Sequence, residues 1–281
     1  MIKIAIMMLV HKNENQVNRL IKHLSKDFDV YVHIDKRCSV KINESENVHI
    51  YKKYKAYHGS FNQIIATLYL LEKAFEKGYD RYLLISGQDL PIKTNEKIKR
   101  VFENNNKEYI NITKIPTSDG WPDMNGLTKY NLDNIYRGLN CTKIQILIYK
   151  TIKKLVYYLS KIIPRKIDYD FYGGANWTNY THNCVKKIFD YLSNDKKYIE
   201  RYKYTNGADE IFYQTIVNKL NGITIENDCL RYVDWESGPE YPRTLRKDDY
   251  KKIVESGNIF ARKFDETVDN EIINIIYETI E

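Results

Sequence analysis

Residues 82–89 read Tyr-Leu-Leu-Ile-Ser-Gly-Gln-Asp. The first four place apolar side chains on both faces of an extended chain, which is typical of a central parallel strand covered by helices. Ligands of open α/β sheets bind just outside the carboxyl ends of such strands. The stretch therefore predicts a parallel sheet and marks Ser86 to Asp89 as a candidate place for chemistry.

The residues before this strand alternate strand and helix patterns. Apolar runs at 4–10 and 30–34 flank a helical pattern at 17–24. A second helix is predicted to begin after Ser60, a good capping residue, and to end at Gly78. Together these patterns predict an α/β fold.

The length and composition are those of a folded globular protein. A chain of 281 residues and 33.5 kDa can bury a full core. No internal repeat or low-complexity linker interrupts the sequence, so we expect a single domain over residues 1–281. We also expect helices near 181–192 and 209–220.

The charge and the cysteines exclude several kinds of site. The formal net charge of +7 is a moderate basic excess that suits an anionic ligand or a membrane surface, and no nucleic-acid-binding motif is present. The four cysteines form no CxxC pair, so neither a zinc site nor a redox motif is indicated. We expect free thiols in a reducing compartment at Cys38, Cys141, Cys184 and Cys229.

One segment, residues 143–166, mixes long aliphatic and aromatic residues with many lysines. This pattern predicts either an amphipathic helix on anionic lipid or a core-packed helix with a solvated lysine face. Pro164 ends the segment in both cases.

Five segments, taken in order, carry a family resemblance. They are Val10-His11-Lys12, His33-Ile34-Asp35-Lys36-Arg37, Leu84 to Lys93 (LISGQDLPIK), Ala208 to Phe212 (ADEIF) and Phe260 to Asp265 (FARKFD). Read together, they resemble the core 2 and I-branching β-1,6-N-acetylglucosaminyltransferase family, which also takes in the peptide O-xylosyltransferases.

The resemblance implies a GT-A-like fold, in which helices flank a twisted, mostly parallel central sheet. It implies that about residues 1–115 bind a nucleotide sugar and that about 116–281 supply the acceptor and catalytic half. The implied reaction transfers a sugar, GlcNAc in most of the family and xylose in some branches, from a UDP donor to a glycan hydroxyl with inversion.

Inversion in one displacement requires a carboxylate within reach of the acceptor hydroxyl. Glu210 matches the family's base. Asp209 and Glu210 also follow the turn Asn206-Gly207 and open an apolar helix, where carboxylates are favourable without any catalytic role. The resemblance decides for catalysis at Glu210.

The departing diphosphate needs positive charge. Ser86-Gly87-Gln88-Asp89 retains one carboxylate of the Asp-x-Asp motif by which many GT-A enzymes bind a metal, so no metal is expected there. The resemblance implies that Lys263 and Arg243 replace the metal, with Arg246 and Arg262 as competitors of Arg243. It also assigns Asp35 and the backbone around Met8 to the uridine end of UDP, whereas His11 and His33 read as structural residues.

Trp235 matches the family tryptophan that stacks on an acceptor sugar. The tyrosine expected two residues later is Ser237, and the family's acceptor-binding Glu, Lys and Arg have no clear counterparts within 108–130. Residues 173–177 resemble the small-residue loop beside the donor sugar, although Trp177 reads equally as a core residue. The acceptor therefore stays open between a glycan and a lipid-linked glycan.

Two other functions compete with this one. Asp168-Tyr169-Asp170 is a formal Asp-x-Asp for a metal-dependent transferase, although it follows no central strand. A non-catalytic glycan-binding module is the second alternative. Animal members of the family carry a membrane anchor and disulfides, and we expect neither feature here. We therefore expect a bacterial, cytoplasmic member with a peripheral contact at the inner membrane face through 143–166.

Overall fold

The computed structural model describes residues 2–118, 125–132 and 142–281. Its helices are α1 (Glu14–Leu24), α2 (Phe61–Phe75), α3 (Asn95–Phe102), α4 (Asn125–Thr128), α6 (Lys143–Ile162), α7 (His182–Asn194), α8 (Lys196–Tyr202), α9 (Asp209–Lys219), α10 (Tyr250–Glu255) and α11 (Asn270–Ile280). Its strands are β1 (Ile4–Val10), β2 (Asp29–Ile34), β3 (Val48–Tyr51), β4 (Arg81–Ser86), β5 (Asp89–Pro91), β6 (Lys107–Ile110), β7 (Thr113–Ile115), β8 (Phe171–Gly173), β9 (Thr178–Thr181), β10 (Thr224–Glu226), β11 (Arg231–Val233) and β12 (Phe260–Arg262).

The main sheet has seven strands in the order β10-β6-β9-β4-β1-β2-β3. β1 pairs in parallel with both β2 and β4, whereas β9 runs antiparallel between β4 and β6. The apolar stretch that predicted a central strand is β4, and every residue of this strand is buried. The predicted α/β fold with a mostly parallel sheet is confirmed.

Local chemistry accounts for the helix boundaries. The hydroxyl of Ser60 accepts a hydrogen bond from the Gln63 amide at 3.3 Å and caps α2, as its sequence predicted. Beyond the end of the helix, Gly78 adopts a positive φ of 72°, a conformation that side chains oppose. Thr181 caps α7 in the same way as Ser60 caps α2. The helices predicted near 181–192 and 209–220 are α7 and α9.

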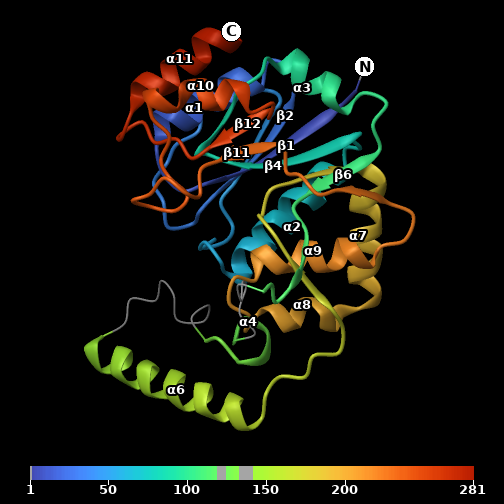
Figure 1. Cartoon of the computed structure of the whole chain (residues 1–281), viewed down its shortest axis with the longest axis vertical. Coiled ribbons are helices and arrows are strands. Elements are labelled where there is room, and N and C mark those ends of the chain that lie inside the picture. The colour runs from blue at the N-terminus through green and yellow to red at the C-terminus, as the bar shows by residue number, and fades with distance from the viewer. Residues whose placement is uncertain (1, 119–124, 133–141) are drawn as a thin grey trace.

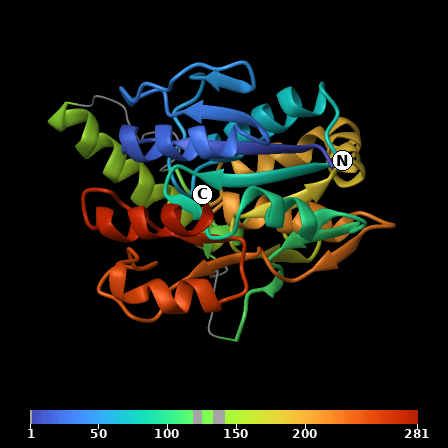
Figure 2. The ribbon, with the colours of Figure 1, turned by 90° about the horizontal axis from the view of Figure 1, so that it is seen from above.

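Hydrophobic cores cover both faces of the main sheet. Alternate residues of β1 enter opposite cores: Ile6 and Met8 pack on the side of α1 and α11, and Ala5 and Met7 on the side of α2 and α9. α11 lies beside α1, to which it is joined by a hydrogen bond of 2.5 Å from Arg19 to Asn274. The layers can be followed in Figure 1 and Figure 2.

A small second sheet, β11-β12-β5, fastens the carboxyl-terminal part of the chain to the loop after β4. β12 pairs antiparallel with β5, and Arg262 lies opposite Asp89. Two segments that carry the sequence resemblance, 84–93 and 260–265, therefore lie side by side.

α6 lies away from the main sheet and its flanking helices, at the lower end of Figure 1. Ser160 is its one buried residue. The alternative that residues 143–166 form a core-packed helix is therefore wrong. No helix in the described residues combines the length and the apolar character that a membrane crossing requires. Cys38, Cys184 and Cys229 are free, and Cys141 lies outside the described residues.

Candidate active site

A cavity of about 890 Å³ opens at the carboxyl ends of β1, β2 and β4. This is the edge of the sheet that the sequence marked for chemistry. Its wall brings together four of the predicted site residues: Asp35, Glu210, Trp235 and Lys263.

Glu210 lies in the first turn of α9, where the chain passes the loop after β8. Its carbonyl accepts a hydrogen bond of 3.0 Å from the Gly174 amide, which fixes the helix start against that loop. Among the described residues, no group donates a hydrogen bond to its carboxylate. The carboxylate is therefore available to accept a proton from a molecule in the cavity.

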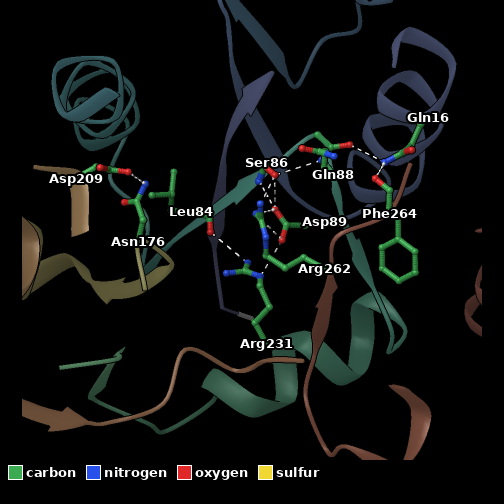
Figure 3. A network of polar contacts seen from close by, with 11 residues as sticks. Gln16, Leu84, Ser86, Gln88, Asp89, Asn176, Asp209, Arg231, Arg262 and Phe264 are labelled. Atoms are coloured by element: carbon green, nitrogen blue, oxygen red, sulfur yellow. Dashed lines mark hydrogen bonds and ion pairs between the residues drawn. The ribbon is translucent and has the colours of Figure 1, made fainter. Parts of the chain in front are cut away.

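Glu210 and its neighbour Asp209 both hold their protons more tightly than ordinary carboxyl groups. Burial, then the charge of Asp209, raises the pKa of Glu210 to about 7, although His58 opposes the shift. Burial raises the pKa of Asp209 to about 7 as well, against opposing backbone hydrogen bonds. The amide of Asn176 donates a hydrogen bond of 3.2 Å to Asp209, as Figure 3 shows. A general base works best with a pKa near the operating pH.

Gly174 is required for a close approach of two backbones. A Cβ added there would lie 1.9 Å from the carbonyl oxygen of Asn111. The family resemblance placed residues 173–177 in a small-residue loop beside the donor sugar. The structure gives a different reason at Gly174, because the clash is with backbone that itself belongs to the cavity wall.

Asp35 follows β2 and is buried in an ion pair with Arg37. The guanidinium contacts both carboxylate oxygens, at 2.9 Å from Nε and 2.7 Å from Nη2. Burial alone would raise the pKa of Asp35, but the hydrogen bonds from Arg37 hold it below its ordinary value. The guanidinium also lies 3.6 Å from the ring centroid of Tyr57, and all three side chains line the cavity.

Asp89 lies beneath the cavity at the centre of a buried polar cluster, drawn in Figure 3. Its carboxylate accepts hydrogen bonds from the Ser86 amide at 2.5 Å and hydroxyl at 2.7 Å. Arg231 lies 3.0 Å and Arg262 3.3 Å from it. Both guanidinium groups also lie over the ring of Trp177, at 4.7 Å and 4.0 Å.

Three arginine and lysine side chains line the cavity, namely Arg37, Arg262 and Lys263. Each of the two arginines is paired with an aspartate, whereas Lys263 forms no ion pair with any residue that the structure describes. Its ammonium is therefore the one of the three with no carboxylate of a described residue in direct contact, although it is near enough to Glu240 to help lower the pKa of that carboxyl group.

Two predicted UDP-binding residues do not line the cavity. The side chain of Met8 is fully buried in the core on the α1 side, because alternation along β1 directs it there, and Leu9 and Val10 line the cavity instead. Arg243 follows the lining residues Tyr241 and Pro242, but its guanidinium lies 3.4 Å from Asp249.

His11 and His33 were both predicted to be structural residues, and the structure places them differently. His33 is buried and accepts a hydrogen bond of 3.1 Å from the Tyr54 amide, as a structural histidine would. His11, also predicted to be structural, is an exposed residue on the cavity wall.

The exposed aromatic side chain predicted to stack on a sugar is present at the cavity. Trp235 lines the wall and leaves 55% of its surface accessible, and Tyr241, 62% exposed, lines the wall with it. An exposed indole beside a cavity can pack against the apolar face of a pyranose.

The family model described as Core-2/I-Branching enzyme matches residues 4–256. The chain belongs to the Core-2/I-Branching enzyme family. The resemblance found in the five sequence segments is thereby confirmed, and the α/β architecture agrees with the GT-A-like fold that this resemblance implied.

Two named relatives of this Core-2/I-Branching chain are distant in sequence. It is 22% identical over 278 residues to the β-glucuronosyltransferase GlcAT14B of Arabidopsis thaliana, covering 94% of this chain and 59% of that protein. It is 23% identical over 313 residues to xylosyltransferase 2 of Pan troglodytes, covering 98% of this chain and 33% of that protein. The chain thus spans about 59% and 33% of the lengths of these relatives.

The side chains at the cavity are a poor fit for a divalent metal. Asp89 is fully buried and its oxygens already face Ser86 and two arginines. Asp168 and Asp170, the alternative pair, contact Lys166 and Lys114 outside the cavity wall. No cluster of three or more potential ligands occurs within the described ranges.

Several cavity residues were not singled out from the sequence. Tyr57 and His58 lie in an irregular segment before α2, where no periodic pattern points to a role. Arg37 stood within a quoted segment, two residues after Asp35, and its spacing after a strand end was a usable signal. Arg262 was considered only as a competitor of Arg243.

Proposed function

We propose that this chain is an inverting glycosyltransferase that uses no metal and transfers a sugar from a UDP donor to a hydroxyl of a glycan acceptor. In one displacement the acceptor oxygen bonds to the anomeric carbon while the bond from that carbon to the diphosphate breaks. Glu210 takes the acceptor proton, and UDP leaves with the bonding electrons.

The observation that carries this proposal is the Glu210 carboxylate, which faces a large cavity, accepts no hydrogen bond from any residue that the structure describes and has its pKa raised by burial to about 7. A carboxylate in this state is ionised over much of the neutral range and retains enough basicity to accept a proton.

Positive side chains on the same wall supply the electrostatics. Lys263 is suited to the diphosphate, since a fixed cation stabilises charge that develops in the transition state. Arg243 would need to leave Asp249 to reach it. Asp35, oriented by Arg37, and the backbone beside Met8 remain our assignment for the uridine end.

Three donor sugars are candidates. We favour GlcNAc from the resemblance, with xylose as the alternative, and the named relatives add glucuronic acid. Trp235 is assigned to the acceptor, which we propose to be a glycan or a lipid-linked glycan. The three free cysteines suit a reducing, cytoplasmic location.

The test is a donor screen with the purified chain. UDP-GlcNAc, UDP-xylose, UDP-glucuronic acid, UDP-galactose and UDP-glucose are each scored by UDP release, with EDTA or with manganese. We expect one donor to be turned over equally in EDTA, and the anomeric configuration of its product, read by NMR, to be inverted. Release that requires manganese would overturn the metal-free mechanism.

A matched pair of variants tests the base. Glu210→Gln keeps the shape of the side chain and should lower turnover by roughly 10²- to 10⁴-fold, the usual contribution of general-base catalysis. Glu278→Gln removes an exposed carboxylate on α11 and should leave turnover unchanged. If the two variants were equally active, the chain would be either a non-catalytic binding module or an enzyme with a different base.

A further inference from the structure

α6 exposes a continuous apolar surface that the fold does not use. Ile144 is 71% exposed and Ile162 is 77% exposed, at the two ends of the helix. The large apolar side chains exposed between them are Ile146, Leu147, Ile148, Ile152, Leu155, Tyr157, Tyr158 and Leu159. Scattered exposed apolar residues are ordinary, but a row along one helix marks an interaction surface.

The helical periodicity shows which way this surface points. Tyr149, Val156 and Ser160 are the residues of α6 that are not exposed, and their spacing of seven and four places them on one face. That face meets the protein, since the Tyr130 amide donates a hydrogen bond of 3.2 Å to Ser160. Ile144, Ile148, Leu155 and Ile162 lie on a different face, directed away from it.

Lysines run along one edge of the apolar face. Lys143, Lys150, Lys154 and Lys161 recur at intervals of seven, four and seven residues, which aligns them in one row on a helix. Lysine stems can lie along an apolar surface while their ammonium groups reach outward. The row therefore forms a charged border to the apolar face.

The net charge of the whole chain resides in this segment. Residues 143–166 hold seven of the 44 basic residues and none of the 37 acidic ones, so the rest of the chain has 37 of each. Arg165 is buried, and the other six are exposed lysines. The surface of α6 is thus complementary to a negatively charged partner that is apolar beneath its charges.

We propose that α6 binds flat on the surface of an anionic lipid bilayer, with its apolar face in the headgroup and acyl boundary and its lysines at the phosphates. A helix of 20 residues is about 30 Å long, and its five lysines favour the interface over the bilayer interior. Pairing with a second copy is disfavoured, because it would bring together two basic segments that contain no acidic residue. The proposal does not rest on the enzymatic function.

The test is flotation of the purified chain with vesicles of phosphatidylcholine alone or of phosphatidylcholine mixed with phosphatidylglycerol, because an anionic surface attracts polybasic segments. We expect binding to the anionic vesicles that weakens as salt is raised. Lys150→Gln/Lys154→Gln/Lys161→Gln should weaken binding by on the order of 100-fold, since each lysine near an anionic surface contributes about 1 kcal/mol. Lys196→Gln/Lys251→Gln/Lys252→Gln removes three exposed lysines elsewhere and should not weaken it.

A second variant separates the apolar contact from the charge. Ile148→Gln/Leu155→Gln keeps every lysine, leaves the buried face of α6 unchanged and should abolish stable binding. Equal binding to neutral vesicles, or no binding to either kind, would overturn the proposal. The proposal would also be overturned if light scattering showed that the parent protein is an oligomer and that Ile148→Gln/Leu155→Gln converts it to monomers. The apolar face would then join copies of the chain. UDP release with a soluble acceptor should be unaffected by either set of variants.

Discussion

Asp89, buried beneath the cavity, forms an ion pair of 3.3 Å with Arg262 on the cavity wall, and the next residue, Lys263, forms no ion pair with any described residue. The two adjacent cations thus have different surroundings. Arg262 is matched by a carboxylate and packed against Trp177, whereas Lys263 has no carboxylate in direct contact among the described residues. This difference predicts different consequences of removing each one.

Lys263→Gln should weaken UDP binding by roughly 10- to 100-fold, because a hydrogen bond to a charged group contributes about 1.5–3 kcal/mol. The free energy of unfolding should change by less than about 0.5 kcal/mol, as for other substitutions away from buried contacts. Isothermal titration with UDP measures the first quantity and urea unfolding the second. Arg243→Gln is the comparison: a loss of affinity as large as that for Lys263→Gln would show that Arg243 leaves Asp249 when UDP binds.

Arg262→Gln should lower stability rather than act only on binding. Removing one partner of a buried ion pair costs about 3–5 kcal/mol, and the remaining contact of Asp89 with Arg231 should keep the loss near the lower end of that range. Thermal unfolding checks this. A variant that unfolds like the parent but binds UDP poorly would instead place Arg262 directly on the diphosphate.

The rate of transfer should depend on pH through Glu210. This carboxyl group must be ionised to accept a proton, and burial raises its pKa to about 7. We therefore expect kcat to rise with pH, to level off above about pH 7 and to fall roughly tenfold per unit at lower pH. A rate that stays flat down to pH 5 would show that another group is the base.

Asp209 should make the protein less stable as the pH rises. Its pKa in the folded protein is about 7, above the ordinary 3.8, so folding is favoured while it keeps its proton. That contribution is present at low pH and is lost as the pH rises through about 7. The change in the free energy of unfolding caused by Asp209→Asn should therefore be more favourable at pH 8 than at pH 5, by on the order of 1–3 kcal/mol. Melting temperatures at the two pH values test this, with exposed Asp168→Asn as the control.

Much of the fold was predictable because its signals are local. The cap at Ser60 and the glycine at 78 bracket α2, and the apolar run of β4 reveals its burial on both faces. The antiparallel strand β9 was not predicted, since its four residues, Thr178–Thr181, contain no apolar run. Strand direction depends on contacts with β4 and β6 that no local pattern records.

The site was predictable only where sequence motifs carried it. Glu210 alone reads as a helix-start carboxylate, and only its position in the fold places it in a cavity with Lys263. The pairing of β5 with β12 unites distant motifs at Asp89 and Arg262, and it depends on tertiary structure. Tyr57 comes from an irregular segment, so its approach to Arg37 could not be anticipated.

Substitution of Trp235 should weaken binding of the acceptor and leave binding of the UDP-sugar donor unchanged. Its exposed ring can stack on a pyranose, so Trp235→Ala should raise the KM for a glycan acceptor by roughly tenfold or more, about the loss of one aromatic contact. Hydrolysis of the UDP-sugar by water needs no acceptor contact and should proceed at the parent rate. Trp235→Phe, which keeps an aromatic face, should recover much of the loss. If transfer and hydrolysis fell together in Trp235→Ala, the indole would be supporting the donor or the cavity wall, and the acceptor would have to bind elsewhere.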